Sequence, residues 1–421
     1  MSAPLLRRRS AAELVRERGC VVSAEAIAAA APIVNAVRAN GENALRLYAE
    51  QFGDVPAGGK LFLERAALEQ SLTKLAREDR VRLERVAERI HLFAAAQKRA
   101  LGTVTVTVPG GSAGHWIAPI ERAGCYAPGG RYPLPSSVLM TAVTARTAGV
   151  KQLWVASPKP SPMTLAAAAL AGADGLLAAG GAHAIAALAF GAGPVPACDV
   201  IAGPGNRYVT AAKHLVSAHV GIDMLAGPTE LVVFADGSAS PTELAADLLA
   251  QAEHDPDARP ILVTTDQRLP DRVEVELARQ LETLATGAVA RRALGNGGVM
   301  VVSSIDDGIA ACDALAPEHL ELFLDDAIGV ASRLAHYGAL FIGGSAAEVL
   351  GDYGAGPNHV LPTGGTARCT GGLSVYTFLR VRTWLRIDDA AAARPLIEDA
   401  AWFGRVEGLE AHARSAEHRL D

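Results

Sequence analysis

Residues 153–190 read LWVASPKPSPMTLAAAALAGADGLLAAGGAHAIAALAF and decide the fold class. Two short apolar runs, Leu153–Ala156 and Gly175–Leu177, are bounded by small or turn-forming residues, as strands are. Each run is followed by an alanine-rich segment of helical character, Met163–Ala171 and Ala182–Phe190. Short apolar strands that alternate with helices are typical of a largely parallel α/β sheet.

The same alternation continues on both sides of this stretch. Further strands are expected at Thr103–Val108, Leu231–Ala235, Ile261–Thr265, Val299–Ser303 and Leu340–Gly343, and a further helix at Ser137–Thr147. Ser240 as a cap, Pro241 at the first helical position and Glu243 at the third predict a helix that runs towards Glu253. Ligands of open α/β sheets bind outside the carboxyl ends of the strands, so the loops after these strands are expected to carry the chemistry.

The two flanks differ from this central texture. Residues 1–105 show leucine and other apolar residues at three- and four-residue spacing among many charges, which indicates a helical arm or bundle. Residues 376–421 return to a charged, helical composition. We therefore predict an α/β fold with two incomplete Rossmann-like parallel-sheet domains, an N-terminal helical arm and a C-terminal helical arm. The predicted boundaries are 1–105, 106–235, 236–375 and 376–421.

Composition excludes several classes of protein. The 421 residues carry a formal net charge of −6 with acids and bases interspersed, which gives no basic stripe for nucleic acid. The five cysteines are scattered without a CxxC pair, which disfavours a disulfide framework and a thiolate zinc site. No membrane span is expected, because no apolar run reaches about 18 residues. No signal peptide is recognised either, so a cytoplasmic location is expected.

Four clusters of polar residues stand beside apolar runs. They are Gln251–Asp255, Ala316–Leu320, Gly351–His359 and Glu407–His412. Taken alone, the first, second and fourth clusters are more simply explained as a polar helix end, a capped surface helix and a solvated helix. A structural loop explains the glycines of the third, but not its concentration of ligand-type side chains.

These clusters contain the side chains that zinc accepts. His254, Asp352 and His412, with Gln251 as a less usual oxygen donor, form a mixed ligand set of the kind found at catalytic zinc sites. Glu318 and His319 are adjacent and suit acid–base chemistry. No GxGxxG motif follows a strand, so these patterns alone do not predict a nicotinamide cofactor.

Taken in order, the motifs of this sequence resemble those of the histidinol dehydrogenase family. The matching segments are GCYAPGGRYPLPSSVLM (124–140), GGAHAIAALAFG (180–191), AGPGNRYVTAAK (202–213), DMLAGPTE (223–230), LLAQAEHDPDA (248–258), APEHLE (316–321), GDYGAGPNHVLPTGGTAR (351–368) and EGLEAH (407–412). The likeness runs over roughly residues 20–418. Each motif is weak alone, but the ordered set is specific.

The resemblance implies a role for particular residues. It implies zinc ligation by Gln251, His254, Asp352 and His412, and acid–base catalysis by Glu318 and His319. Substrate contacts are implied for Thr229, Gln251, His254, Glu318, Asp352, His359, Glu407 and His412, and NAD contacts for Tyr126, His183 and Asn206. It further implies a homodimer in which the C-terminal arm crosses over, so that Glu407 and His412 complete the site of the other chain. The 106–235 domain would then bind NAD, and the 236–375 domain would hold zinc and the catalytic residues.

The reaction implied is oxidation of L-histidinol by two NAD, through histidinal, to L-histidine, the last step of histidine biosynthesis. Three features depart from the common pattern: His183 in place of glutamine, Thr229 in place of serine, and the tail after His412. Two alternatives therefore stay open. One is a related zinc- and NAD-dependent dehydrogenase of another small polar alcohol, such as sulfopropanediol. The other is a zinc-dependent binding protein without catalysis, which the presence of both Glu318 and His319 disfavours.

Overall fold

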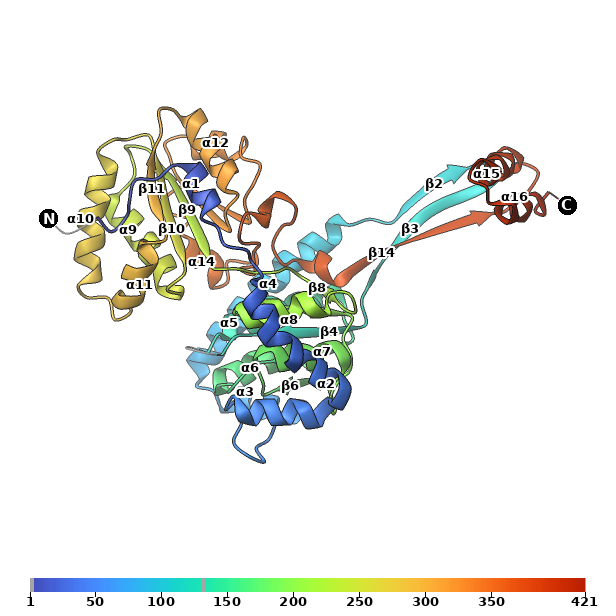
Figure 1. Cartoon of the computed structure of the whole chain (residues 1–421), viewed down its shortest axis with the longest axis horizontal. Coiled ribbons are helices and arrows are strands. Elements are labelled where there is room, and N and C mark those ends of the chain that lie inside the picture. Colours follow the sequence, from blue (N-terminus) through green and yellow to red (C-terminus); the bar gives the residue numbers. More distant parts are fainter. Residues whose placement is uncertain (1–3, 130–132, 421) are drawn as a thin grey trace.

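The computed structural model describes residues 4–129 and 133–420, in two lobes and a long arm (Figure 1). Residues 130–132, which fall within the 124–140 motif, lie outside the described residues. None of the helices in the described part is long and apolar enough to cross a membrane. The expected strands and helices of the central texture are present close to their predicted ends. The helix that begins at Pro241 is capped by the Ser240 side chain, which accepts from the Glu243 N–H, as predicted.

The first lobe is built on a six-stranded sheet in the order β1-β6-β5-β4-β7-β8. All its pairings are parallel except that of β1 with β6. The strands are β1 (Phe62–Glu64), β4 (Arg122–Tyr126), β5 (Gln152–Ala156), β6 (Gly175–Leu177), β7 (Val200–Ala202) and β8 (Gly221–Ile222). Two groups of helices enclose the sheet, which buries most of its side chains. They are α2 (Ala24–Gln51), α7 (Gly181–Phe190) and α8 (Arg207–Val216) in one group, and α3 (Arg65–Lys74), α4 (Arg77–Ala100), α5 (Pro135–Ala148) and α6 (Pro162–Leu170) in the other.

The second lobe is built on a five-stranded, wholly parallel sheet in the order β11-β10-β9-β12-β13. The strands are β9 (Glu230–Ala235), β10 (Arg259–Thr264), β11 (Gly298–Val301), β12 (His319–Phe323) and β13 (Ala339–Ile342). Separate apolar cores form on its two faces, as expected for a sheet buried on both sides. The helices of this lobe are α1 (Ala11–Arg16), α9 (Pro241–His254), α10 (Leu269–Leu281), α11 (Gly287–Leu294), α12 (Ile305–Leu315), α13 (Ala327–Ala331) and α14 (Glu348–Asp352).

The N-terminal region is largely helical, as predicted, but it does not form a separate arm. Helices α2, α3 and α4 pack on the helices of the first lobe, and β1 joins its sheet. Residues 4–16 instead lie along the second lobe, where Leu6 and Leu14 are buried and the backbone pairs with Val299 at the sheet edge. Apolar spacing showed that these helices bury one face, but it carries no information about which surface covers that face.

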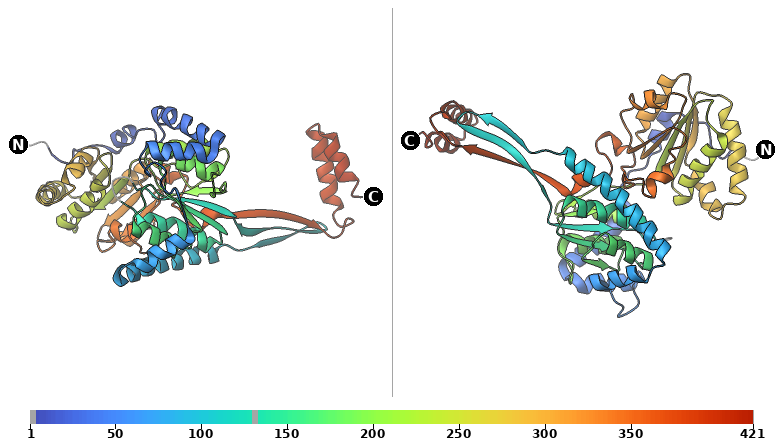
Figure 2. Two further views of the ribbon diagram at one scale, coloured as in Figure 1. Left: turned by 90° about the horizontal axis from the view of Figure 1, so that it is seen from below. Right: turned by 180° about the vertical axis from the view of Figure 1, so that it is seen from behind.

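The arm is a three-stranded antiparallel sheet, in the order β14-β3-β2, that carries α15 and α16 at its tip (Figures 1 and 2). Its elements are β2 (Val104–Val108), β3 (Gly111–Pro119), β14 (Leu379–Ile387), α15 (Arg394–Val406) and α16 (Glu410–Glu417). The prediction of helix throughout 376–421 is therefore wrong for β14. Apolar and charged residues alternate along much of LRVRTWLRI, a period of two that fits a strand with two exposed faces. The boundary at 106 is also misplaced, because it cuts through β2.

Candidate active site

The catalytic pair expected from the sequence lies where two neighbouring strands begin. His319 is the first residue of β12, and Glu318 directly precedes it. β12 pairs in parallel with β9, with His319 opposite Leu231, which brings Glu318 beside Thr229 at the start of β9. The expected catalytic pair therefore lies at the amino edge of this sheet and not at the carboxyl edge, where the sequence rule places ligands. The reversal of α12 at Ala316, which has a φ of 43°, delivers Glu318 to the amino edge instead.

A dense set of hydrogen bonds holds the Glu318 carboxylate. Glu318 Oε2 accepts from the Thr229 hydroxyl at 2.5 Å and from the Glu230 backbone N–H at 3.0 Å. The Gln251 amide lies 2.7 Å from the same hydroxyl. With its oxygen turned to the Glu230 N–H (3.0 Å), its nitrogen donates to Glu348 Oε1 at 2.9 Å. Neutral donors therefore hold the Glu318 carboxylate, and the Glu348 carboxylate lies on the other side of the Gln251 amide.

His319 lies among carboxylates. Its Nδ1 is 3.3 Å from Glu348 Oε1 and 3.7 Å from Glu318 Oε2, and its Nε2 is 3.7 Å from Asp352 Oδ1. Burial opposes the charged imidazole, but the negative charges of Glu348 and Glu318 outweigh it and raise the pKa of His319 to about 10. Burial raises the pKa of Glu318 to about 7, against the opposing effect of His319. An acid near neutrality beside a basic imidazole is an arrangement suited to two different proton transfers.

The same cluster has the composition of a cation site. One donor atom each from His319, Glu348 and Asp352 lie within 4.8 Å of one another, and all three residues are buried. Neither ring nitrogen of His319 has a hydrogen-bond partner, and nor does Glu348 Oε2. Imidazole and carboxylate donors fit zinc, and buried acids that lack partners fit a positive charge.

This geometric group differs from the ligand set expected from the sequence, with which it shares only Asp352. Gln251 and His254 occupy the last turn of α9, which contacts α14, the helix that ends at Asp352. Asp352 is buried, which opposes its ionisation, yet its pKa is lowered by His319 above all and by the charges of His359 and His254. Gln251, His254 and Asp352 therefore belong to one neighbourhood.

Glu348 is the site residue that the sequence reasoning missed. It is 2% exposed at the first position of α14, and its backbone N–H donates to Glu321 Oε1 at 2.6 Å. Burial raises the pKa of Glu348 well above its usual value. Acidic residues are common at the start of helices on a protein surface. The only feature of the sequence that could mark Glu348 as a site residue is its place within the apolar segment AAEVL.

His359 joins the site to the first lobe. Its Nδ1 lies 2.8 Å from the Asp352 carbonyl oxygen, and its Nε2 lies 3.4 Å from the Ser137 hydroxyl in α5. The neighbouring Asn358 donates to the Met140 carbonyl in the same helix at 2.8 Å. The cluster around Asp352 therefore faces the edge of the first lobe at which α5 begins.

The three residues expected to contact NAD lie at the carboxyl edge of the first sheet. Tyr126 ends β4, and its hydroxyl accepts from the Gly181 N–H at 3.2 Å. His183, in α7, is 1% exposed, and its Nε2 lies 2.9 Å from Asp54 Oδ2. Asn206 follows β7 and caps α8 by accepting from the N–H groups of Tyr208 and Val209. These three residues therefore lie at the edge where the sequence rule expects a ligand of this lobe.

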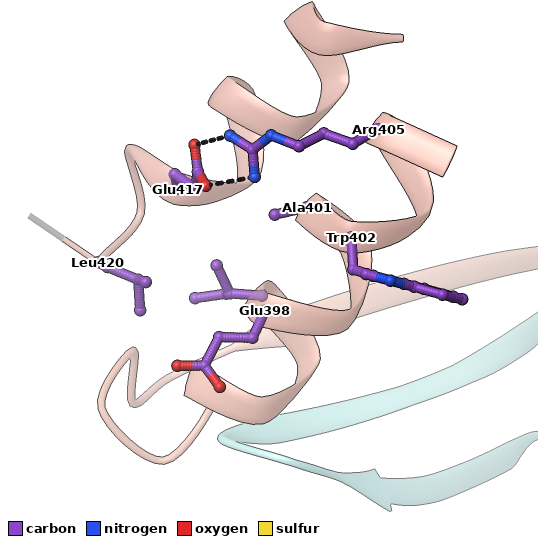
Figure 3. Close-up of a pocket in the computed structure, with 7 residues that line it drawn as sticks. Glu398, Ala401, Trp402, Arg405, Glu417 and Leu420 are labelled. Carbon is purple, nitrogen blue, oxygen red and sulfur yellow. Dashed lines mark hydrogen bonds and ion pairs between the residues drawn. The ribbon is translucent and has the colours of Figure 1, made fainter. Parts of the chain in front are cut away.

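Glu407 and His412 do not join the site within one chain. Glu407 follows α15 and His412 lies in α16, both exposed at the tip of the arm and far from the second lobe (Figures 1 and 2). A hollow of about 360 Å³ opens between these helices, where Glu417 pairs with both terminal nitrogens of Arg405 at 2.8 and 2.9 Å (Figure 3). This hollow holds none of the expected catalytic residues.

Comparison with known proteins shows what the chain resembles. The family model described as histidinol dehydrogenase matches residues 17–420. The chain is 47% identical over 388 residues to histidinol dehydrogenase of Thermus thermophilus, which covers 92% of this chain and 93% of that protein. It is 42% identical over 395 residues to that of Geobacter sulfurreducens, covering 92% of each. The crystal structure of histidinol dehydrogenase from Elizabethkingia anophelis superposes with a TM-score of 0.92 at 30% identity, covering 100% of this chain and 99% of that one. The chain therefore belongs to the histidinol dehydrogenase family, a family of oxidoreductases.

Proposed function

We propose that this enzyme oxidises L-histidinol through L-histidinal to L-histidine, with zinc and NAD, as the last step of histidine biosynthesis in the cytoplasm. The relatives at 41–47% identity carry the name of this activity. The observation that carries the proposal is the buried Glu318–His319 pair beside a group of cation-binding side chains. Family membership and this geometry point in the same direction.

The two catalytic side chains would share the proton transfers. When bound, zinc supplies a positive charge that orients the substrate nitrogens, and NAD supplies the hydride acceptor. With the charge of a bound metal nearby, the carboxylates would no longer hold a proton on His319, and its neutral imidazole would take the proton of the alcohol as the first hydride leaves. Glu318 removes a proton from the water that attacks the aldehyde, and the second oxidation gives the carboxylate. The hydroxyl of Thr229, 2.5 Å from Glu318, holds the base in place between the two steps.

Zinc would be held by Gln251, His254 and Asp352, with His412 of a second chain. The exposed position of His412 on α16 at the arm tip supports this swap, and so does the exposed apolar surface of the adjoining α15. Trp402, Phe403 and Val406 are 59%, 56% and 62% exposed. Exposed apolar area of this kind marks a protein–protein contact. Thr229 and His359, with Glu407 of the second chain, would contact the substrate, and the enzyme would work as a homodimer.

NAD would lie at the carboxyl edge of the first sheet, in reach of Tyr126 and Asn206. His183 stands at the same edge, but Asp54 and the ring of Phe52 already engage its imidazole. This difference from the common glutamine, together with the tail after His412, is the reason for the alternative, a dehydrogenase of another small polar alcohol such as a sulfonated diol. Cofactor identity and substrate identity therefore need separate tests.

The decisive experiment follows NADH formation by the zinc-loaded protein supplied with histidinol and NAD. Two NADH for each histidinol, the stoichiometry of a four-electron oxidation, support the proposal. Turnover of a sulfonated diol but not of histidinol moves the enzyme to the alternative. Calorimetric binding of histidinol without any NAD reduction shows a binding protein instead. Chelation of the metal provides the control, because it is expected to abolish the histidinol-dependent rate and zinc to restore it.

A further inference from the structure

Glu230, Arg18 and Arg259 form a cluster of three charged side chains next to the Glu318 carboxylate. Glu230, the first residue of β9, is 3% exposed. Arg18 donates to both oxygens of its carboxylate, from Nε at 3.2 Å and from Nη2 at 3.3 Å, and Arg259 Nη1 donates to Oε1 at 3.3 Å. Such a fork of donors fixes a carboxylate in direction as well as in position.

Arg18 reaches this cluster from a different part of the chain. It lies in the segment that leaves α1 on the second lobe and crosses to α2 on the first (Figure 1). Its Nη2 also donates to the carbonyl of Leu315, the last residue of α12. Three residues after that carbonyl comes Glu318. The guanidinium also lies against Gly365, where any Cβ would come within 2.4 Å of Nη1.

Arg18 therefore contacts both parts of the structure that position Glu318, which are the start of β9 and the turn after α12. The backbone N–H of Glu230 donates to Glu318 Oε2, and Thr229, the other donor, is the preceding residue. The turn that delivers Glu318 begins at the carbonyl that Arg18 binds. We propose that Arg18 is a positioning residue, which holds Glu318 in register with Thr229 for the step in which water attacks the aldehyde. The catalytic part of this inference rests on the proposed function.

A purely stabilising role fits the cluster less well. Without Arg18, Glu230 keeps a charged partner in Arg259, whose other terminal nitrogen donates to the Leu14 carbonyl at 2.6 Å. Loss of Arg18 therefore does not leave a buried charge alone, the condition that makes a broken ion pair strongly destabilising. It does release the Leu315 carbonyl, where the turn to Glu318 begins, and one side of the Glu230 carboxylate, whose residue supplies the N–H donor to Glu318.

The test compares Arg18→Met and Arg18→Lys with Arg9→Met in the full-length, zinc-loaded enzyme. Arg9 is the matched control, because it lies on the same N-terminal segment and pairs only with exposed Glu17 among the ion pairs described. For Arg18→Met, kcat for supplied histidinal is expected to fall about 10–100-fold, the cost of a misplaced catalytic group. KM for histidinol, zinc content and the thermal midpoint are expected to stay close to those of the control. Arg18→Lys should recover part of the rate, since it restores the charge but not the fork.

Two results overturn the proposal. One is an equal loss in the alcohol and aldehyde half-reactions, or a loss that adds in full to that of Glu318→Gln. The other is a crystal structure of Arg18→Met in which Thr229 Oγ1 and Glu318 Oε2 are still 2.5 Å apart, as they are here. That distance does not depend on the substrate. If wild-type enzyme fails to oxidise histidinol, the proposed function falls while a lengthened distance still supports the positioning role.

Discussion

The two lobes are built on similar parallel sheets, yet they present opposite edges to the site. In the first lobe Tyr126 ends β4 and Asn206 follows β7, both at the carboxyl edge of the sheet. In the second, Glu318 and His319 lie at the amino start of β12. The bridge from His359 to Ser137 shows that these edges face each other. Under the proposed function, the rule that ligands bind at the carboxyl ends of strands describes the first lobe, whereas the second lobe contributes residues from its amino edge.

Each lobe also has a buried ion cluster behind its candidate residues, and the two clusters differ in redundancy. In the first lobe Lys213 pairs with Asp223, and together they bind the backbone of Gly203: Asp223 Oδ2 accepts its N–H at 2.7 Å and Lys213 donates to its carbonyl at 2.9 Å. In the second lobe two arginines share Glu230. Removal of one cation should therefore lower the free energy of unfolding more in the first lobe than in the second.

The largest expected effect tests the edge of the second lobe as a metal site. His254→Ala is expected to lose bound zinc and with it all measurable turnover, since zinc sites of this kind depend on each protein ligand. Metal content by elemental analysis and NADH formation are measured together. His214→Ala, an exposed histidine on α8 of the first lobe, is the control. Unchanged zinc content in His254→Ala would reject this ligand and favour the geometric group of His319, Glu348 and Asp352.

The next effect tests Glu318 as the base of the second oxidation. In Glu318→Gln, oxidation of supplied histidinal should fall about 10²–10⁴-fold, the usual contribution of such a group, while the alcohol step falls much less. Burial raises the pKa of Glu318 to about 7, and a base must be ionised, so the wild-type aldehyde rate should rise as pH increases through this region. Thr229→Ser keeps the hydroxyl donor and serves as the control. Equal losses in both steps, or a pH profile that the glutamine variant retains, would remove this role.

The sequence predicted local features well and long-range ones poorly. The segment 153–190 gave β5, α6, β6 and α7, because period and turn residues are local signals. The Ser240 cap predicted the start of α9, and the last turn of this helix carries Gln251 and His254. Arg18 gave no signal, since its partner Glu230 is 212 residues away. The strand pattern does not determine which edge of a sheet faces another lobe, so it could not predict that Glu318 and His319 lie at an amino edge.

The difference in redundancy between the lobes predicts a stability effect of intermediate size. Lys213→Met leaves Asp223 buried without its cation, which should lower the free energy of unfolding by about 3–5 kcal/mol. Urea denaturation of the apo-protein measures it, with exposed Lys151→Met as the control. Replacing Asp223 by leucine as well should recover part of the loss, because the unpaired charge is then gone. An Arg18→Met variant destabilised as much as Lys213→Met would contradict the idea that Arg259 compensates in the second lobe.

The smallest expected effect concerns His183, the first-lobe residue that differs from the common glutamine. Its Nε2 is 2.9 Å from Asp54, which also accepts from the Gly180 N–H at 2.8 Å, and its ring stacks on Phe52 with centroids 5.6 Å apart. A glutamine amide can also donate to Asp54, so His183→Gln should change KM for NAD by less than about fivefold, as expected when one neutral hydrogen bond worth ~1 kcal/mol is exchanged for another. The measurement is KM for NAD at saturating histidinol. A larger change in KM would mean that the imidazole itself touches the cofactor, which requires the pair with Asp54 to open when NAD binds.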